Sequence, residues 1–141
     1  MRPWTIEYAD LDFERFYLSL APYEQAVVDA ALTTVLAVHG IAAFDGGWGK
    51  ALGAGLYEFR IQRSLDAIMS MADTTSPLVG DTGRRLSIRI FCTFHGNKII
   101  VLFQGYDKGR DPSTRRQQQE IARARRALQQ WRIAHRNDTK S

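Results

Sequence analysis

Residues 86–103 impose the strongest constraint on the fold, because two apolar stretches flank a short polar turn. In residues 86–94, an apolar set of side chains alternates with a mixed set, as in a strand with one face in a core. Residues 95–97, His-Gly-Asn, are typical of a hairpin turn. Residues 98–103 are almost wholly apolar, as a central strand is. The pattern therefore predicts a β-hairpin at the centre of a sheet.

Two further segments alternate with a period of two and add strands to this sheet. One runs from Trp4 to Tyr8, and the other covers residues 56–63. Residues 10–39 instead carry apolar side chains at helical spacing, so we expect a helical hairpin there. Residues 40–55 hold six glycines without the spacing of a phosphate-binding loop, and we expect them to form an irregular connection.

Apolar residues at helical spacing recur over residues 115–133, among many arginines, and predict a C-terminal helix. The expected fold is α+β, with an N-terminal strand and helical hairpin packed on an antiparallel sheet, and one domain over residues 1–141. Residues 64–83 form a long insertion between two strands, and its first part is expected to make one or two helical turns. Residues 134–141 are expected to be a frayed tail.

The composition excludes several classes of protein. With 45% hydrophobic and 24% charged residues, the 141-residue chain is typical of a globular protein. No apolar run approaches the roughly 20 residues that span a bilayer, and the polar N-terminus does not have the pattern of a signal peptide. The single cysteine, Cys92, makes neither a disulfide framework nor a cysteine-rich zinc site. We therefore expect a cytoplasmic protein that does not associate with membranes.

Charge is distributed unevenly along the chain. Residues 1–49 contain two basic and seven acidic residues, whereas residues 50–141 contain 17 basic and eight acidic residues. A basic half attracts polyanions, most simply a nucleic acid. On charge alone, a solvated basic face is an equally acceptable interpretation.

Five short stretches follow one another in a characteristic order. They are Lys50-x-Leu52, GLYEFRI at 55–61, Arg89-Ile90-Phe91, GNKIIVLFQGYDK at 96–108 and EIARA at 120–124. Together they resemble the RelE/HigB/ParE superfamily, the toxins of bacterial type II toxin–antitoxin pairs, and most of all its phage-type HigB-like branch. The resemblance covers about residues 4–130, interrupted by the insertion at 64–83.

The resemblance implies an antiparallel sheet with an N-terminal helical hairpin, and it implies cleavage of messenger RNA, usually on the ribosome. In that reaction a ribose 2′-OH attacks the adjacent phosphate, and neither a metal ion nor another cofactor is expected. The step needs an acceptor for the hydroxyl proton, positive charge beside the phosphorane and a proton donor for the leaving 5′-oxygen. The implied partners are messenger RNA, the ribosome and a cognate antitoxin, expected to be a helix-turn-helix protein.

The resemblance assigns basic residues of the strands to the phosphate. Arg89 stands where the family has its strand arginine, and we expect it on an exposed face of the sheet, where its guanidinium fork fits phosphate oxygens. The implied catalytic set is Arg89, Lys108, Arg60, Tyr106 and Arg110, with His95 and Asp107 as further candidates for proton transfer. The implied RNA-binding residues are Lys50, Arg63, Arg115 and Arg116.

The chain departs from the family pattern in two places. The family usually carries a second basic residue after the one at Lys108, but Gly109 stands here, and we expect Arg110 to turn inward in its place. The final helix also lacks the tyrosine that some RNA-cleaving members use.

Other interpretations remain open. Arg60 and Arg89 also fit ordinary strand residues that pair with Glu58, and the C-terminal arginines fit the solvent side of a helix. For the whole protein, the alternatives are a ParE-like toxin that inhibits DNA gyrase by binding alone, and an inactive relative that only binds an antitoxin or a nucleic acid.

Overall fold

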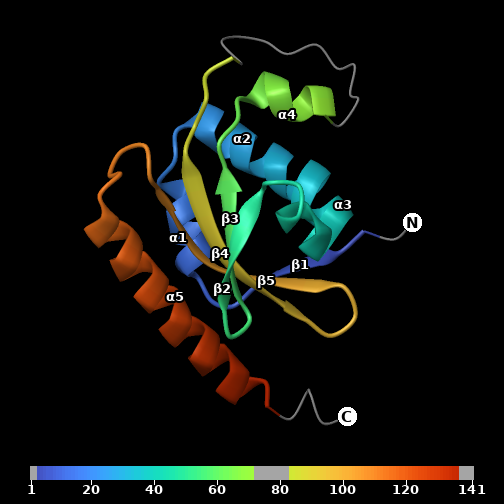
Figure 1. Cartoon of the computed structure of the whole chain (residues 1–141), viewed down its shortest axis with the longest axis vertical. Coiled ribbons are helices and arrows are strands. Elements are labelled where there is room, and N and C mark those ends of the chain that lie inside the picture. The colour runs from blue at the N-terminus through green and yellow to red at the C-terminus, as the bar shows by residue number, and fades with distance from the viewer. Residues whose placement is uncertain (1–2, 72–82, 137–141) are drawn as a thin grey trace.

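The structure, a computed structural model, describes residues 3–71 and 83–136. Its centre is a five-stranded mixed sheet with the order β1-β5-β4-β3-β2, and helices pack on it (Figure 1). The strands are β1 (Thr5–Tyr8), β2 (Gly49–Gly53), β3 (Leu56–Ile61), β4 (Ile88–His95) and β5 (Ile99–Asp107). The α+β class and the central hairpin of β4 and β5 were both predicted from the sequence, and both are confirmed.

The prediction of a purely antiparallel sheet is wrong at one edge. Strands β2 to β5 pair antiparallel, but β1 pairs parallel with β5, with Thr5 opposite Ile99 and Tyr8 opposite Leu102. A tight turn forces neighbouring strands to run antiparallel, whereas β1 and β5 are joined by most of the chain, so no turn fixes their direction.

Residues 40–55 also differ from the irregular connection that was predicted. They contain a 3₁₀-helix, η2 (Gly40–Phe44), and the edge strand β2, which pairs with β3. A Cβ atom at Gly49 would overlap the carbonyl oxygen of Glu58 and the ring of Phe44, so glycine permits this close pairing. Glycine is depleted in strands, which is why the sequence pattern concealed β2.

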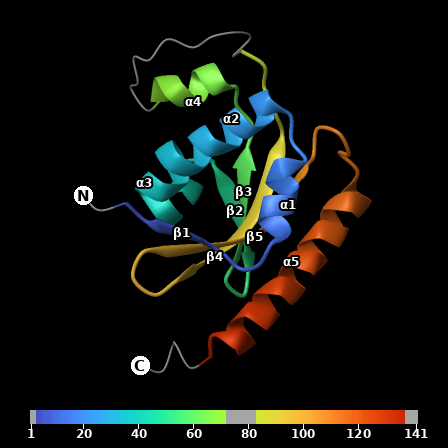
Figure 2. The ribbon, with the colours of Figure 1, turned by 180° about the vertical axis from the view of Figure 1, so that it is seen from behind.

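A helical layer covers one face of the sheet (Figure 2). It contains α1 (Asp12–Leu18), α2 (Pro22–Ala31), the π-helical turn η1 (Leu32–Leu36), α3 (Ala37–His39) and α4 (Leu65–Met71). The predicted helical hairpin and the predicted turns at the start of the insertion are therefore confirmed, while residues 72–82 of the insertion lie outside the described part. Apolar side chains such as Phe13, Val28, Leu36, Phe59 and Ile90 form the core on this side.

The continuous helical segment Pro22–Phe44 is long and apolar enough to cross a membrane by length and composition, contrary to the expectation from the sequence that no run reaches that length. Half of its most apolar window is buried inside the fold, as in the core helix of a soluble protein, so this single segment is weak evidence for a membrane span.

The long helix α5 (Thr114–Ala134) covers the opposite face of the sheet (Figures 1 and 2). Ser113 caps its start, where the Ser113 hydroxyl accepts a hydrogen bond from the backbone N–H of Arg116 at 3.1 Å. A second apolar cluster, which includes Phe91, Phe103 and Leu128, joins α5 to the sheet. Of the predicted frayed tail, residue 134 ends α5, residues 135 and 136 are described, and residues 137–141 lie outside the described part.

Candidate functional site

Three of the predicted catalytic residues lie side by side on the face of the sheet that α5 covers. Arg60 on β3 is opposite Arg89 on β4, and Arg89 is opposite Tyr106 on β5. Directly opposed residues have Cβ atoms roughly 4.5–5.5 Å apart. Arg60, Arg89 and Tyr106 therefore form a row across three strands, which we call the arginine row.

A β-bulge brings Tyr106 into this row. The pairing of β4 with β5 shifts between Ile90 and Cys92, so Phe103 and Gln104 together oppose Phe91. The extra residue reverses the alternation of β5 beyond that point, and it turns Tyr106 toward α5 while Gly105 faces Phe16 of α1. Without the bulge, Tyr106 would point to the helical layer instead of the arginine row.

Glu58 connects the two arginines of the row. Its carboxylate is fully buried, lies 2.7 Å from Nε of Arg60 and 3.8 Å from Nε of Arg89, and accepts a hydrogen bond from the Gln117 side chain at 3.4 Å. Two guanidinium groups thus share one buried carboxylate. One positive charge is left unbalanced, which favours an anion at this position.

Arg89 is buried, which corrects the prediction that it lies on an exposed face. Its side chain is only 3% exposed, because α5 covers this face of the sheet. Burial lowers the pKa of Arg89, and the charge of Glu58 opposes that shift. Nε of Arg89 has no hydrogen-bond partner within residues 3–71 and 83–136, and Nη1 reaches Ser87 Oγ only at 3.5 Å.

Tyr106 also carries a buried polar atom without a partner. Its hydroxyl makes no hydrogen bond to any described residue, while its ring stacks on Phe91 and lies under the guanidinium of Arg116. Burial raises the pKa of Tyr106, the charge of Glu58 raises it further, and Arg89 lowers it. The phenol therefore stays protonated near neutral pH, where it can donate a hydrogen bond but cannot act as a base.

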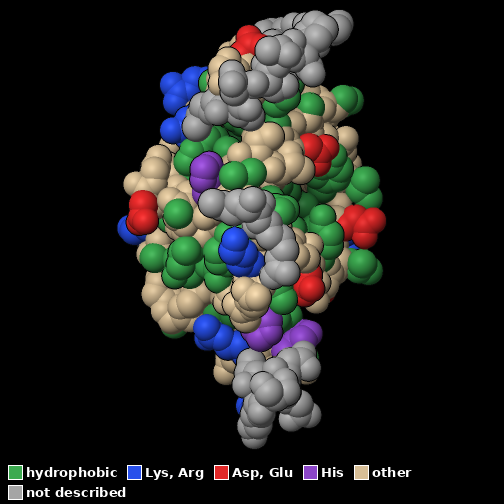
Figure 3. Space-filling view, turned by 90° about the vertical axis from the view of Figure 1, so that its right-hand side faces the viewer, with side chains coloured by type: hydrophobic (Ala, Val, Ile, Leu, Met, Phe, Trp, Pro, Cys, Tyr) green, Lys and Arg blue, Asp and Glu red, His purple; other side chains and the backbone are tan. Residues whose placement is uncertain are grey.

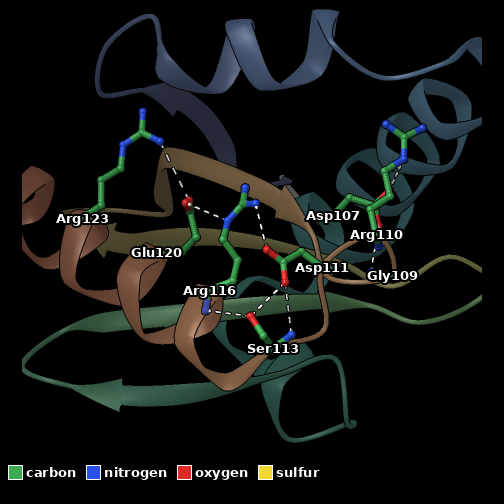
Figure 4. A network of polar contacts seen from close by, with 8 residues as sticks. All are labelled: Asp107, Gly109, Arg110, Asp111, Ser113, Arg116, Glu120 and Arg123. Atoms are coloured by element: carbon green, nitrogen blue, oxygen red, sulfur yellow. Dashed lines mark hydrogen bonds and ion pairs between the residues drawn. The ribbon is translucent and has the colours of Figure 1, made fainter.

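The first turns of α5 lie over the arginine row, where Arg116 contacts Tyr106 and Gln117 contacts Glu58. A polar network runs along these turns and the loop before them (Figure 4). Arg116 pairs with Glu120 at 3.3 Å and with Asp111 at 3.6 Å, and Asp111 also accepts a hydrogen bond from the Ser113 hydroxyl. The side-chain amide of Gln104 donates to the backbone carbonyl of Glu120 at 3.0 Å. Among these contacts, the hydrogen bond from Gln104 joins α5 to the sheet, and the others hold the first turns of α5 to the loop before it.

A cavity of about 200 Å³ lies at the Tyr106 end of the row. Its lining includes Tyr106 and Gly105 of β5, Phe16 of α1, and the arginines Arg110 and Arg116. Two guanidinium groups from different segments thus border a small cavity that adjoins the candidate proton donor.

Arg110 does not turn toward the arginine row as the sequence predicted. Its side chain is 66% exposed, and it pairs with Glu24 of α2 at 3.3 Å and with Asp107 at 3.4 Å. Asp107 also accepts hydrogen bonds from the backbone N–H groups of Gly109 and Arg110, so it caps this turn (Figure 4). Lys108 is half-buried, and no ion pair joins it to another described residue.

The remaining predicted residues are dispersed. Lys50 is exposed on β2 opposite Glu58, so it extends the basic side of the row, and Arg115 is exposed on the first turn of α5. Arg63 instead lies over the ring of Trp48 at 4.2 Å, on the side of the helical layer. His95 is six residues along β4 from Arg89, roughly 20 Å away, and its ring contacts Trp131.

Sequence reasoning assigned no role to Glu58 beyond that of a partner for Arg60 or Arg89, and it did not consider Gln117. Glu58 could have been found from alternation alone, because residues 58 and 60 share a face of β3 and a lone acidic residue among inward-pointing side chains requires a buried partner. Gln117 had no such signal, since its position depends on how α5 packs.

Comparison with known proteins adds no identification: no family model matches the sequence, and neither a curated protein nor a solved structure matches the chain. The class of protein is thus defined by its own fold and site, an α+β fold with a five-stranded mixed sheet and a row of two arginines and a tyrosine beneath the C-terminal helix.

Proposed function

We propose that this protein is the toxin of a type II toxin–antitoxin pair and cleaves messenger RNA on the ribosome by attack of a ribose 2′-OH. The arginine row with its buried Glu58 is the observation that carries the proposal. It brings two cations, a carboxylate and a protonated phenol to adjacent positions on three strands. The helical hairpin and the antiparallel part of the sheet also agree with the resemblance read from the sequence.

Each group has a role in the reaction. Arg60 and Arg89 stabilise the charge that develops on the phosphorane, since guanidinium groups bind phosphate oxygens in pairs. The Glu58 carboxylate accepts the proton of the 2′-OH as its oxygen bonds to phosphorus. Tyr106 donates its proton to the 5′-oxygen as the P–O5′ bond breaks, leaving a 2′,3′-cyclic phosphate and a 5′-hydroxyl. Proton exchange with water then restores both side chains.

Substrate access requires that the first turns of α5 move away from the row. In this structure Arg116 and Gln117 contact Tyr106 and Glu58 from above. These contacts are individually weak, since a cation–π contact at a partly exposed site stabilises by roughly 0.5–1 kcal/mol. An RNA strand whose phosphates bind Arg60 and Arg89 offsets the loss of these two contacts.

The test uses the purified protein, ribosomes and a translated message in the presence of a chelator. We expect new 5′-hydroxyl ends within the coding region. We expect Glu58→Gln and Arg60→Gln, assayed at a temperature where each variant is folded, to reduce cleavage by about 100-fold or more. Intact message with folded wild-type protein contradicts the proposal. So does full cleavage by folded Glu58→Gln protein.

The near-complete burial of Arg89 favours a second candidate, a toxin that inhibits DNA gyrase by binding alone. A row closed by α5 suits a structural role, in which Glu58 and the arginines stabilise the sheet. Expression without a partner distinguishes the two: this candidate arrests growth with intact messages and with DNA breaks trapped on gyrase.

A further inference from the structure

The second half of α5 borders another cavity, of about 430 Å³, next to the turn between β2 and β3. Its apolar lining comes from Ala54 of the turn and from Leu128 and Ile133 of the helix. Its rim is formed by three arginines and a glutamine of α5: Arg125, Gln129, Arg132 and Arg136. This spacing of four, three and four residues places all four side chains along one flank of the helix.

Two of these arginines are held in place by the β2–β3 turn. Arg125 donates hydrogen bonds to the backbone carbonyls of Leu52 at 2.6 Å and Gly53 at 3.2 Å. The guanidinium of Arg132 lies against Gly55, where a Cβ atom would overlap it. Ordering of these two side chains lowers the entropy lost when a ligand binds them.

The segments around the cavity are rich in basic residues, of which Arg123 pairs with Asp12 and Glu120. Residues 49–55, 93–98 and 121–136 together contain seven basic residues and no aspartate or glutamate. The arginine row is different, because there Glu58 balances one of two guanidinium groups. The flank of α5 is therefore a basic surface, and its arginines Arg125, Arg132 and Arg136 are exposed.

Aromatic rings lie beside the arginines at the end of α5. His135 stacks on Trp131 with ring centroids 4.6 Å apart, and His95 contacts the same ring edge-on at 4.9 Å. Figure 3 shows His side chains at the lower end of the molecule, with Lys or Arg side chains next to them. Rings next to guanidinium groups are typical of surfaces on which bases stack and phosphates bind.

We infer that this flank of α5, with the β2–β3 turn, binds single-stranded RNA at a distance from the arginine row. The inference rests on the proposed function, since it takes RNA as the ligand, and adds a surface that holds the strand beside the bond to be cleaved. Arg116 and Arg132 are 16 residues apart, so the bound strand follows roughly 24 Å of α5. The apolar lining accommodates a base, and the arginine rim binds the phosphates on either side.

The test compares two adjacent glutamines of α5. Gln129 lines the cavity and Gln130 is not among its lining residues, and both are exposed. Gln129→Glu and Gln130→Glu therefore add the same charge at positions about 100° apart around the helix, one at the cavity and one beside it. A fluorescent 2′-O-methyl oligouridylate serves as the ligand, because without a free 2′-OH it binds but is not cleaved. We expect Gln129→Glu to weaken binding several-fold more than Gln130→Glu does.

Salt dependence gives a second measure. Each lost phosphate contact lowers the slope of log K against log salt concentration by about 0.7 for a single strand, so Arg132→Gln should lower it by about that amount. Equal binding by both glutamine variants overturns the inference. So does equal competition by polyglutamate, since it assigns the flank to an acidic protein.

The outcomes separate this inference from the proposed function. If the oligonucleotide binds as expected but no variant and no wild-type protein cleaves a message, the cleavage proposal fails and this surface stands. If messages are cleaved normally while both glutamine variants bind alike, only this surface is overturned.

Discussion

The face of the sheet under the helical layer and the face under α5 are built from the same strands, but they bury different side chains. Under the helical layer the core is apolar, and Glu24, one of its few buried polar residues, pairs with Arg110 and accepts the backbone N–H of Ala21. Under α5 lie the buried polar residues Glu58, Arg89, Thr93, Gln104 and Glu120. Every buried side-chain nitrogen or oxygen atom that lacks a hydrogen-bond partner among the described residues belongs to this second face.

This difference indicates that the face under the helical layer stabilises the fold and that the face under α5 is arranged to bind a ligand. An unsatisfied buried polar group costs about 1–3 kcal/mol, so a fold selected for stability alone would replace such groups. The face under the helical layer satisfies that condition, whereas the face under α5 keeps groups that need a further partner. Unpartnered groups gathered on one face are typical of a site whose ligand supplies the missing contacts.

The largest expected effect comes from Glu58→Leu, which leaves Arg89 buried without its counter-charge. Removing one partner of a buried pair costs about 3–5 kcal/mol in the free energy of unfolding. Arg89→Leu should cost less, because Glu58 keeps its contact with Arg60 at 2.7 Å. Urea denaturation of both variants measures the asymmetry.

The control lies on the other face, where Leu36→Ala opens a cavity at a cost of about 2–5 kcal/mol. Adding Arg89→Leu should recover part of the stability lost in Glu58→Leu, but it should not help Leu36→Ala. Equal stability of Glu58→Leu and wild type would mean that the charge cluster is open to water, and the contrast between the faces would then fail.

Tyr106→Phe tests the same contrast with a smaller change. The hydroxyl has no partner among the described residues, so its removal should raise the free energy of unfolding by about 1 kcal/mol. Under the proposed mechanism, cleavage should nevertheless fall by about 100-fold, because the proposed proton donor is gone. Tyr57→Phe, on the side of the helical layer, is the matched control and should leave cleavage unchanged. A stabilised Tyr106→Phe protein with full activity would remove Tyr106 from the mechanism.

The two faces of the sheet also differ in how much of their structure could be predicted from the sequence. Alternation in residues 86–94 and helical spacing in 10–39 reflect a simple separation of apolar from polar side chains, and they predicted the core under the helical layer. The same alternation placed Arg89 on the opposite face correctly but left it exposed, because nothing local reveals that α5 returns to cover that face.

Two more features depended on geometry that residue types do not encode. Alternation along β5 would direct Tyr106 to the helical layer, and only the bulge at Phe103 and Gln104 reverses it. The glycines of β2 resembled a loop because their role is to admit a close neighbour. The fold therefore brings some of the predicted site residues together and places the others far apart.

Tyr17, on the side of the helical layer, extends the comparison of the two faces to the dependence of stability on high pH. Tyr17 donates a hydrogen bond to Asp29 at 2.6 Å, and this bond raises the pKa of Tyr17 to about 12, above its ordinary value near 10. The folded state therefore holds the proton more tightly than the unfolded state, and this contribution to stability is complete below pH 10 and disappears as the pH rises toward 12. Tyr17→Phe should flatten that part of the profile of unfolding free energy against pH. An unchanged profile would contradict the Tyr17–Asp29 bond.

Arg110→Gln is expected to have the smallest effect. The sequence pattern assigned Arg110 to the phosphate, but its side chain is exposed and pairs with Glu24 and Asp107 on the side of the helical layer. Water screens the exposed guanidinium of Arg110, and the buried Glu24 keeps its hydrogen bond from the backbone N–H of Ala21, so stability should change by only about 0–1 kcal/mol. Cleavage should also stay near the wild-type rate, whereas Arg60→Gln, the same chemical change in the arginine row, should reduce it by about 100-fold or more. Single-turnover cleavage by the two variants decides between the faces, because equal losses would mean that Arg110 leaves Glu24 and reaches the substrate through the cavity beside Tyr106.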